Sequence, residues 1–203
     1  MRNNFKNAIS ERPDSITIKG EQYSTALTEL DLSYKEINDD DIKPLKYMSN
    51  LTVLNLDVND IGDLTPLAEL KNLTTLIVGK DQNESSDDNY KNYIHDLTPL
   101  SELTRLTKLD LFCNNIVDIT PLANLVNLAE LNLADNCIRD ISPLAGLVNL
   151  NYANLMWNDI TDLSPLAGLV SLNNVNLYCN DITDWSPVDH VGTVRKRVLK
   201  KNG

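Results

Sequence analysis

The sequence has few of the residues on which catalysis, disulfide frameworks and membrane insertion depend. It contains two histidines and three cysteines, and aromatic residues make up 5% of its 203 residues. An odd number of cysteines argues against a disulfide framework and indicates reduced thiols. There is no run of about 20 apolar residues, so the sequence predicts no membrane-spanning segment.

Positive charge is also scarce. There are 18 Lys and Arg against 29 Asp and Glu, which gives a formal net charge of -11. We therefore expect no binding to nucleic acid or to an anionic membrane, since both rely on Lys and Arg. A protein or peptide partner is favoured, particularly one with a basic surface. We expect the chain itself to be a monomer.

The first residues, 1–7, lack the apolar core of a secretory signal. If this is the full-length chain, we expect it to be cytoplasmic. If a signal has been removed, we expect the protein to be secreted or attached to the cell surface. The sequence leaves both alternatives open.

The most prominent feature of the sequence is a pattern that repeats about every 22 residues. Four of the six intervals between its aligned leucines are 22 residues long, and the other two are 24 and 33. Seven of the eight prolines keep the same phase. Self-similarity at a fixed period of this length is typical of a stacked solenoid. The leucines are Leu27, Leu51, Leu73, Leu106, Leu128, Leu150 and Leu172, and the prolines are Pro44, Pro66, Pro99, Pro121, Pro143, Pro165 and Pro187.

Each repeat predicts a short strand followed by a turn. Leu131 and Leu133 alternate with polar residues, which indicates a strand with one buried face. Asn136 then ends the strand, and we expect its side chain to bind backbone groups of its own coil and the next. Pro143 fixes φ and favours a short 3₁₀ or extended segment. The same asparagine recurs as Asn59, Asn114, Asn136, Asn158 and Asn180.

A row of aspartates keeps the same period. We expect the carboxylate of Asp140 to accept hydrogen bonds from backbone N–H groups of the next turn. A cation-binding track is the alternative, but every coil needs such acceptors locally, so the structural role is favoured. The row consists of Asp63, Asp96, Asp118, Asp140, Asp162 and Asp184.

The combined pattern, L-x-x-L-x-L-x-x-N-x-I-x-D-[IL]-x-P-L-x-x-L, resembles the internalin type of bacterial leucine-rich repeat over residues 27–193. The resemblance implies an α/β fold: a right-handed solenoid of about seven repeats, with a parallel sheet on its concave face and short 3₁₀ or extended segments on its convex side. It also implies protein binding on the sheet. The sequence departs from the internalins in showing no helical N-terminal cap, wall anchor or following Ig-like domain.

Three regions follow from these patterns. Residues 1–26 are predicted to form an N-terminal cap, with an extra strand at 15–19 that Gly20 turns. Residues 27–193 form the solenoid. Residues 194–203 form a basic C-terminal cap or tail, interpreted as a solvated end rather than a nucleic-acid patch.

The candidate binding site lies on the predicted concave face. Side chains between and after the two leucines of each strand, such as Asn132, Ala134 and Asn154, are expected to face solvent there. Aromatic residues and methionine gather in the C-terminal half of this face, which is typical of interface centres. The alternative is lateral packing of Trp157 or Phe112 over a neighbouring strand. The candidate residues are Phe112, Tyr152, Met156, Trp157 and Tyr178, with an acidic rim of Asp57, Asp110, Glu130 and Asp135.

The third repeat carries a polar, acidic insertion at residues 80–92, which predicts a solvated surface loop. Asp81, Asn83, Ser85 and Asp87 alternate like the first ligands of a calcium loop. The match is incomplete, because Ser86 replaces the required glycine and Asn92 replaces the bidentate glutamate. We therefore predict no metal and no cofactor.

The function predicted from the sequence is non-enzymatic protein binding. The only histidines, His95 and His190, lie four repeats apart, and there is no phosphate-binding glycine loop, so no catalytic residue is assigned. The alternative is a structural spacer, or a repeat module of a larger bacterial surface or effector protein.

Overall fold

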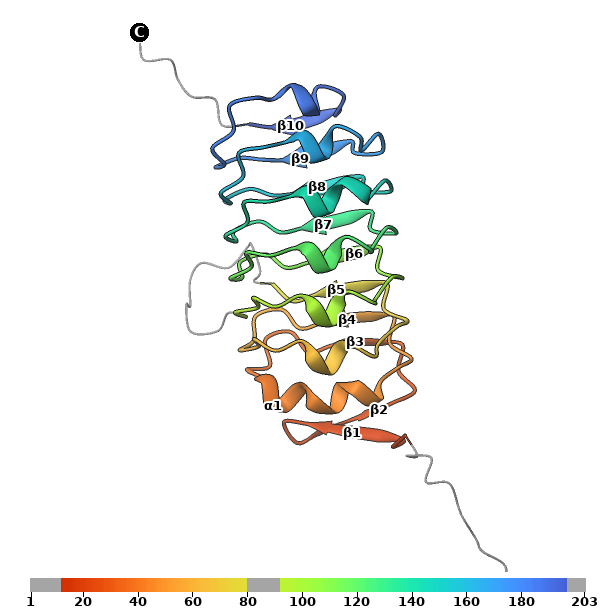
Figure 1. The fold of residues 1–203 in the computed structure, drawn as a ribbon. Helices are drawn as coiled ribbons and strands as arrows, with labels where there is room; N and C mark the ends of the chain where they lie inside the picture. Colours follow the sequence, from red (N-terminus) through yellow and green to blue (C-terminus); the bar gives the residue numbers. More distant parts are fainter. Residues whose placement is uncertain (1–11, 80–91, 197–203) are drawn as a thin grey trace, which may run out of the picture.

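The computed structural model describes residues 12–79 and 92–196, which form a stack of coils built on one parallel sheet (Figure 1). The sheet has eight parallel strands in chain order, so each coil of the chain returns beside the one before it. Its strands are β3 (Glu29–Asp31), β4 (Val53–Asn55), β5 (Thr75–Ile77), β6 (Lys108–Asp110), β7 (Glu130–Asn132), β8 (Tyr152–Asn154), β9 (Asn174–Asn176) and β10 (Thr193–Arg195). The predicted leucine-rich-repeat solenoid is thereby confirmed, with the sheet on its concave side.

The alternating leucines account for the short strands and for the core. Leu131 lies at the centre of β7 and Leu133 follows its end, and both are fully buried. Because equivalent residues pair in register from β3 to β10, the leucines of successive coils form one continuous core. The aligned leucines predict seven strands. The eighth, β10, pairs with β9 and continues the sheet to Arg195, past the boundary expected at residue 193.

The convex side consists of short 3₁₀ segments, as the prolines predict. Each has proline at its first or second position, which fixes φ where no N–H partner is needed. A four-residue helix, α1 (Asp39–Ile42), precedes the first of them. The 3₁₀ segments are η1 (Lys43–Tyr47), η2 (Thr65–Leu67), η3 (Thr98–Leu100), η4 (Thr120–Leu122), η5 (Ser142–Gly146), η6 (Ser164–Leu166) and η7 (Ser186–Val188).

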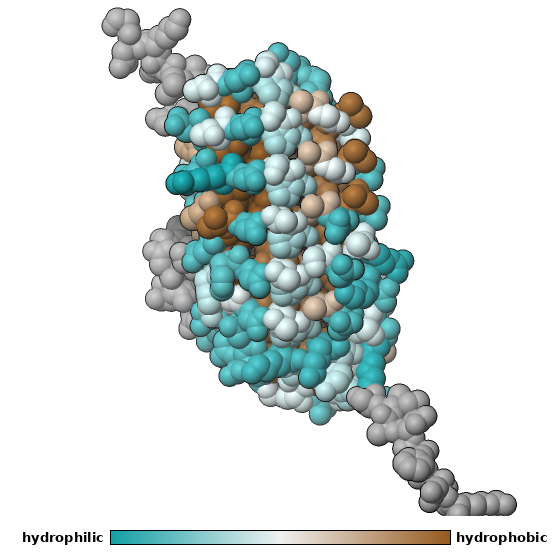
Figure 2. Space-filling model, in the orientation of Figure 1, coloured by the Kyte–Doolittle hydropathy of each residue, from teal (hydrophilic) through white to brown (hydrophobic). Residues whose placement is uncertain are grey.

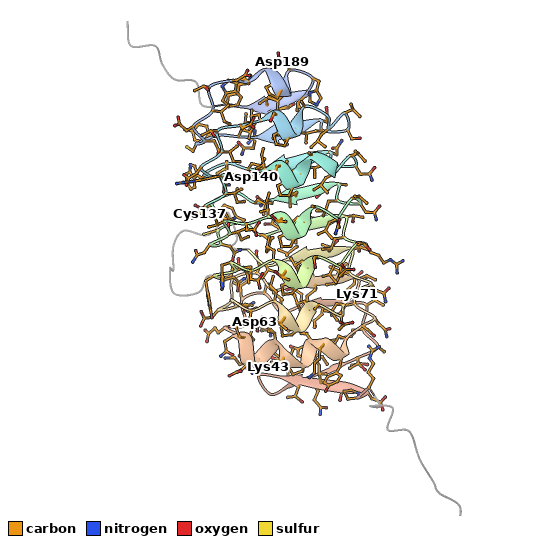
Figure 3. The ribbon with its side chains drawn as sticks, in the orientation of Figure 1. Lys43, Asp63, Lys71, Cys137, Asp140 and Asp189 are labelled. Atoms are coloured by element: carbon orange, nitrogen blue, oxygen red, sulfur yellow. The ribbon has the colours of Figure 1, made fainter. Side chains whose placement is uncertain are left out.

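The aspartate row lies where the 3₁₀ segments begin, as Asp63 and Asp140 show (Figure 3). Oδ1 of Asp140 accepts a hydrogen bond of 2.8 Å from the N–H of Ser142, two residues further on. The carboxylate therefore serves the turn that directly follows it, where η5 begins. The nearest free amide is the one at the start of its own 3₁₀ segment, and a short side chain reaches it more easily.

A ladder of asparagines joins neighbouring coils. Oδ1 of Asn158 accepts from the N–H of Ile138 at 2.9 Å, and its Nδ2 donates to the carbonyl oxygens of Leu133 at 2.9 Å and Leu155 at 3.2 Å. One residue thus satisfies backbone groups of two coils. Because the coils of β4 to β9 repeat this arrangement, the ladder fixes the spacing of the stack.

The ladder includes Asn92, the last residue of the predicted insertion. Its side chain is fully buried, accepts from the N–H of Ile61 at 3.0 Å and donates to the carbonyl oxygens of Leu56 and Gly79. The insertion therefore lies between β5 and the asparagine of its own coil. The residues that alternate like calcium ligands, Asp81, Asn83, Ser85 and Asp87, lie outside the described residues.

The first coil is covered by an antiparallel hairpin, drawn below the stack in Figure 1. It consists of β1 (Ser15–Ile18), at the position of the expected cap strand, and β2 (Glu21–Ser24), which was not anticipated. Lys19 and Gly20 turn the chain with φ of 48° and 81°. Ile16 and Ile18 are buried against the first coil, so the hairpin shields the end of the core.

The last described coil is covered by partly buried side chains. Val188 and Val191 complete the core, and Trp185 packs against it. Nζ of Lys196 lies 4.8 Å from the centre of the Trp185 ring, in a cation–π contact. Within the residues described, no helix has the length and apolar character needed to cross a membrane.

Candidate partner-binding face

The register of the sheet sorts its solvent-facing residues into rows. The first row holds the residues that begin each strand, and the middle row those that end it. The third row lies two residues beyond the strand end. The left-handed row lies one residue further, where φ is positive in coil after coil. In the coils of β6 to β9, the first row consists of Lys108, Glu130, Tyr152 and Asn174, and the middle row of Asp110, Asn132, Asn154 and Asn176. The third row consists of Phe112, Ala134, Met156 and Tyr178. The left-handed row consists of Cys113, Asp135, Trp157 and Cys179.

Three of the four residues of the middle row are buried and Asp110 is half-buried, contrary to the expectation that residues between the leucines face solvent. Asn132 and Asn154 are 8% and 4% exposed, and Ala134 in the third row is fully buried. Oδ1 of Asn132 accepts from the N–H of Ala134, two residues on, and Asp110 does the same for Phe112. These side chains fold back to close the end of their own strand. The row itself was predicted from the 22-residue spacing, but its members were expected to be exposed.

The third row brings together three of the predicted site residues. Phe112, Met156 and Tyr178 follow β6, β8 and β9, so Phe112 and Tyr178 are three strands, or about 14 Å, apart. Phe112 and Met156 are half-buried, whereas Tyr178 is 44% exposed. Sδ of Met156 lies 3.1 Å from Nδ2 of Asn176. The row is a continuous apolar strip with Tyr178 at its exposed end.

The third row depends on the absence of a side chain at Gly79. A Cβ atom there would lie 2.9 Å from the carbonyl oxygen of Phe112 and 3.0 Å from its nitrogen. The N–H of Gly79 donates to Oδ1 of Asp57 at 2.7 Å, which holds the segment in place. Glycine therefore lets the coil of β5 approach the backbone of Phe112.

Trp157 and Asp135 extend this strip into the left-handed row, with φ of 52° and 56°. The N–H of Trp157 donates to the carbonyl oxygen of Tyr178 at 2.9 Å, and that of Asp135 donates to Met156 at 2.9 Å. The tryptophan is 48% exposed and Asp135 is half-buried. A bulky residue at positive φ is unusual, and here hydrogen bonds between coils hold the backbone in that conformation.

Tyr152, Asp110 and Glu130 belong to the first two rows and not to the aromatic strip, although Asp110 is only two residues from Phe112. Tyr152 is in the first row, four residues or about 13 Å along the strand direction from Met156. Together with Lys108 and Asn132, these three residues line a pocket of about 160 Å³ across β6, β7 and β8. The predicted site is therefore divided between a pocket in the first two rows and an aromatic strip in the other two.

The pocket contains a carboxylate that is poorly solvated. Burial raises the pKa of Asp110, while hydrogen bonds from Nδ2 of Asn132 and from the N–H of Phe112 act in the opposite direction. Nδ2 of Asn132 lies 3.0 Å from both carboxylate oxygens. Nζ of Lys108 pairs with Oε2 of Glu130 at 3.1 Å. The 22-residue spacing of Lys108 and Glu130 was the signal in the sequence that could have identified this pair.

A larger groove, of about 550 Å³, lies off the sheet face. Its lining includes Arg139, Asp159 and Asp181, and Nε of Arg139 lies 3.4 Å from Oδ2 of Asp159. The 3₁₀ side of the molecule is largely hydrophilic, with apolar side chains gathered along one edge of the C-terminal coils (Figure 2). Exposed valines recur at one phase of these coils as Val126, Val148 and Val170. Neither surface includes a predicted site residue.

Groups that could support catalysis are dispersed. His95 precedes η3 and His190 follows η7, where its Nε2 lies 3.1 Å from the carbonyl oxygen of Leu169. The three cysteines form no disulfide with one another. In the described part of the chain, no three His, Cys, Asp or Glu side chains are grouped so as to hold a metal ion.

Coils of this construction define the chain as a leucine-rich-repeat solenoid. A leucine rich repeat family model matches residues 104–160, and a second matches residues 47–64. No curated protein sequence matches the chain significantly.

Three solved structures are similar to the chain. Internalin C2 from Listeria monocytogenes is 30% identical with a TM-score of 0.64, and the match covers 87% of this chain and 85% of that one. Internalin F from the same species is 26% identical with a TM-score of 0.58, covering 86% of this chain and 63% of that one. A leucine-rich-repeat protein from Leptospira interrogans shares the fold, at 22% identity and a TM-score of 0.63, covering 75% of this chain and 38% of that one.

The chain belongs to the internalin family of leucine-rich-repeat proteins, because it is 30% identical to internalin C2 over 85% of that chain. The resemblance drawn from the repeat pattern is thereby confirmed. The fold is generally that of a non-enzymatic protein-interaction module.

Proposed function

We propose that this protein is a non-enzymatic module that holds a protein or peptide partner against its sheet face, with Trp157 and Tyr178 at the centre of the contact. The main support is the aromatic strip. In a chain with 5% aromatic residues, two large aromatic side chains are nearly half exposed in adjacent coils. Tryptophan and tyrosine are the residues that most often dominate binding energy at interfaces.

The surroundings of the strip favour a basic partner. Asp135 lies in the same row as Trp157, one coil earlier, and Glu130 is exposed at the start of the same coil, in the first row. The net charge of -11 extends this bias to the whole molecule. Such a field increases the association rate and discriminates against acidic competitors. We infer that the protein acts as a monomer.

The test is a double substitution, Trp157→Ala with Tyr178→Ala. Partners are first identified by crosslinking and mass spectrometry, and the affinity of the purified partner is then measured by calorimetry. We expect a loss of at least about tenfold, because truncation of central aromatics removes most of the buried apolar contact.

Tyr34→Ala is the matched control. Tyr34 is 45% exposed and occupies the left-handed row in the first coil of the same face, far from Trp157. We expect this variant to keep the wild-type affinity. A loss below about tenfold in the double variant, with its unfolding midpoint retained, would contradict the proposal and favour a spacer role.

A further inference from the structure

The pocket across β6, β7 and β8 differs chemically from the aromatic strip. Its walls combine the Asp110 carboxylate, the Tyr152 side chain and the Lys108–Glu130 ion pair, and Asn132 closes one side. We call it the Asp110 pocket. It opens on the sheet face, so a side chain of a partner lying on that face can enter it.

The charges of the Asp110 pocket are incompletely compensated. Lys108 contributes one positive charge, and Asp110 and Glu130 contribute two negative charges, so the lining carries a formal charge of -1. The ammonium of Lys108 is bound to Glu130 at 3.1 Å and acts on Asp110 only through space. Around the Asp110 carboxylate the remaining compensation comes from neutral donors, the Asn132 amide and the Phe112 N–H.

We propose that the Asp110 pocket receives an arginine side chain of the protein partner. The proposal rests on the proposed function, because it assigns one subsite of the same face. A guanidinium at Asp110 neutralises the charge of the lining. It also donates hydrogen bonds from an ionised group to the carboxylate, and these are stronger than the bonds from the neutral Asn132 amide and Phe112 N–H. It also adds a second, polar anchor beside the aromatic strip, because Asp110 lies two residues before Phe112.

Arginine fits this lining better than lysine does. The guanidinium is planar, donates from several N–H groups and is more weakly hydrated than an ammonium, so it loses less on entering a half-buried site. The Tyr152 ring offers a flat surface for stacking and for a cation–π contact. Glu130 lies diagonally across from Asp110 in the register of β6 and β7 and is paired with Lys108, so the guanidinium donates to the Asp110 carboxylate.

The probe is a blocked tripeptide, acetyl-Gly-Arg-Gly-amide, titrated into the full chain labelled with ¹⁵N. Matched peptides carry lysine or the neutral isostere citrulline in place of arginine. We expect saturable amide shifts at Leu109, Asn132 and Tyr152 with the arginine peptide, at a dissociation constant on the order of millimolar. The lysine peptide should bind more weakly, and the citrulline peptide should cause no saturable shift.

Two aspartate variants with the same change in net charge separate local from long-range effects. Asp110→Asn replaces the carboxylate by the residue that occupies the same register in β4, β7, β8 and β9, so the fold is retained. Asp162→Asn makes the same change beside η6, on the convex side. We expect Asp110→Asn to weaken the arginine peptide at least about tenfold and Asp162→Asn to leave its affinity unchanged.

Equal binding of the arginine and citrulline peptides would overturn the proposal. So would equal weakening in the two variants, which would show that net charge alone attracts the peptide. Either failure leaves the proposed function standing, because that function is tested by the loss of the whole partner in the Trp157 and Tyr178 variant. Conversely, a peptide that binds only through Asp110 supports the pocket even if those aromatics prove dispensable.

Discussion

Replacing Asn158 with alanine should destabilise the solenoid far more than the loss of one polar side chain usually does. The Asn158 side chain is 7% exposed and serves four backbone groups. Three of them are the carbonyl oxygens of Leu133, Leu155 and Met156. Each of these keeps another donor in the variant, from Asn136, Asn180 and Asp135 respectively.

The fourth group carries most of the cost. The N–H of Ile138 donates only to Oδ1 of Asn158 among the hydrogen bonds described, at 2.9 Å, and Ile138 is fully buried. An unsatisfied buried N–H costs about 1–3 kcal/mol, and the weakened carbonyl contacts add about 1 kcal/mol. The expected loss is therefore about 2–4 kcal/mol, which corresponds to a fall of roughly 5–15 °C in Tm for a domain of this size.

Urea unfolding followed by circular dichroism measures this change, and Asn149→Ala is the matched control. Nδ2 of Asn149 donates to the carbonyl oxygen of Val126 at 2.8 Å, but the residue is exposed, so water can replace the bond. We expect that control to cost less than about 1 kcal/mol. If the two substitutions cost the same, the argument that buried asparagines hold the coils together is refuted.

Two further predictions concern Gly79 and Asp110. Gly79→Ala should destabilise the fold by about 1–3 kcal/mol, because the added Cβ would press on the backbone of Phe112. Gly146→Ala should be neutral, because a Cβ there meets nothing closer than 3.9 Å. Thermal unfolding of the two variants tests this difference. Burial raises the pKa of Asp110 in the folded state, so its ionisation opposes folding once the pH exceeds the unfolded value of about 3.9. Asp110→Asn should therefore gain stability relative to the wild type as the pH rises from about 3 to 7. A hydrogen bond from the Ser164 N–H lowers the pKa of Asp162, so Asp162→Asn should lose relative stability over the same range. Urea midpoints at both pH values decide this, and parallel behaviour of the two variants would contradict it.

The repeat, the strands and the 3₁₀ segments could be predicted because each follows from the spacing of leucine and proline along the chain. The burial of Asn132 and Asn154 could not. The sequence pattern around an asparagine between two core leucines is the same whether its side chain faces solvent or accepts a hydrogen bond from the backbone at the end of its own strand. Asn92 was assigned to the loop because the insertion shifted its phase. The strand β10 was missed because Val191 stands where the earlier coils have their aligned leucine, and it follows Leu172 after 19 rather than 22 residues.

The sequence indicated which types of residue the candidate site contains. It did not indicate that these residues are divided between a pocket and an aromatic strip. Exposure of Trp157 and Tyr178 follows from their place outside the leucine pattern. The Asp110 pocket, in contrast, depends on which residues become neighbours across strands. That information is present only in pairs of residues one period apart, such as Lys108 and Glu130. Reading such pairs along the repeat would have separated the pocket from the aromatic strip.

The position of Asn92 shows how a solenoid of this kind can be extended without being broken. Although β5 and β6 are separated by 33 residues rather than 22, Ile77 still pairs with Asp110 and Asn92 still occupies the ladder. The segment between a strand and its ladder asparagine is thus a site at which residues can be inserted while both neighbouring coils stay in register. A peptide grafted at the same point of a later coil would leave the scaffold beside the left-handed row, which makes this point the natural place to build new specificity into the protein.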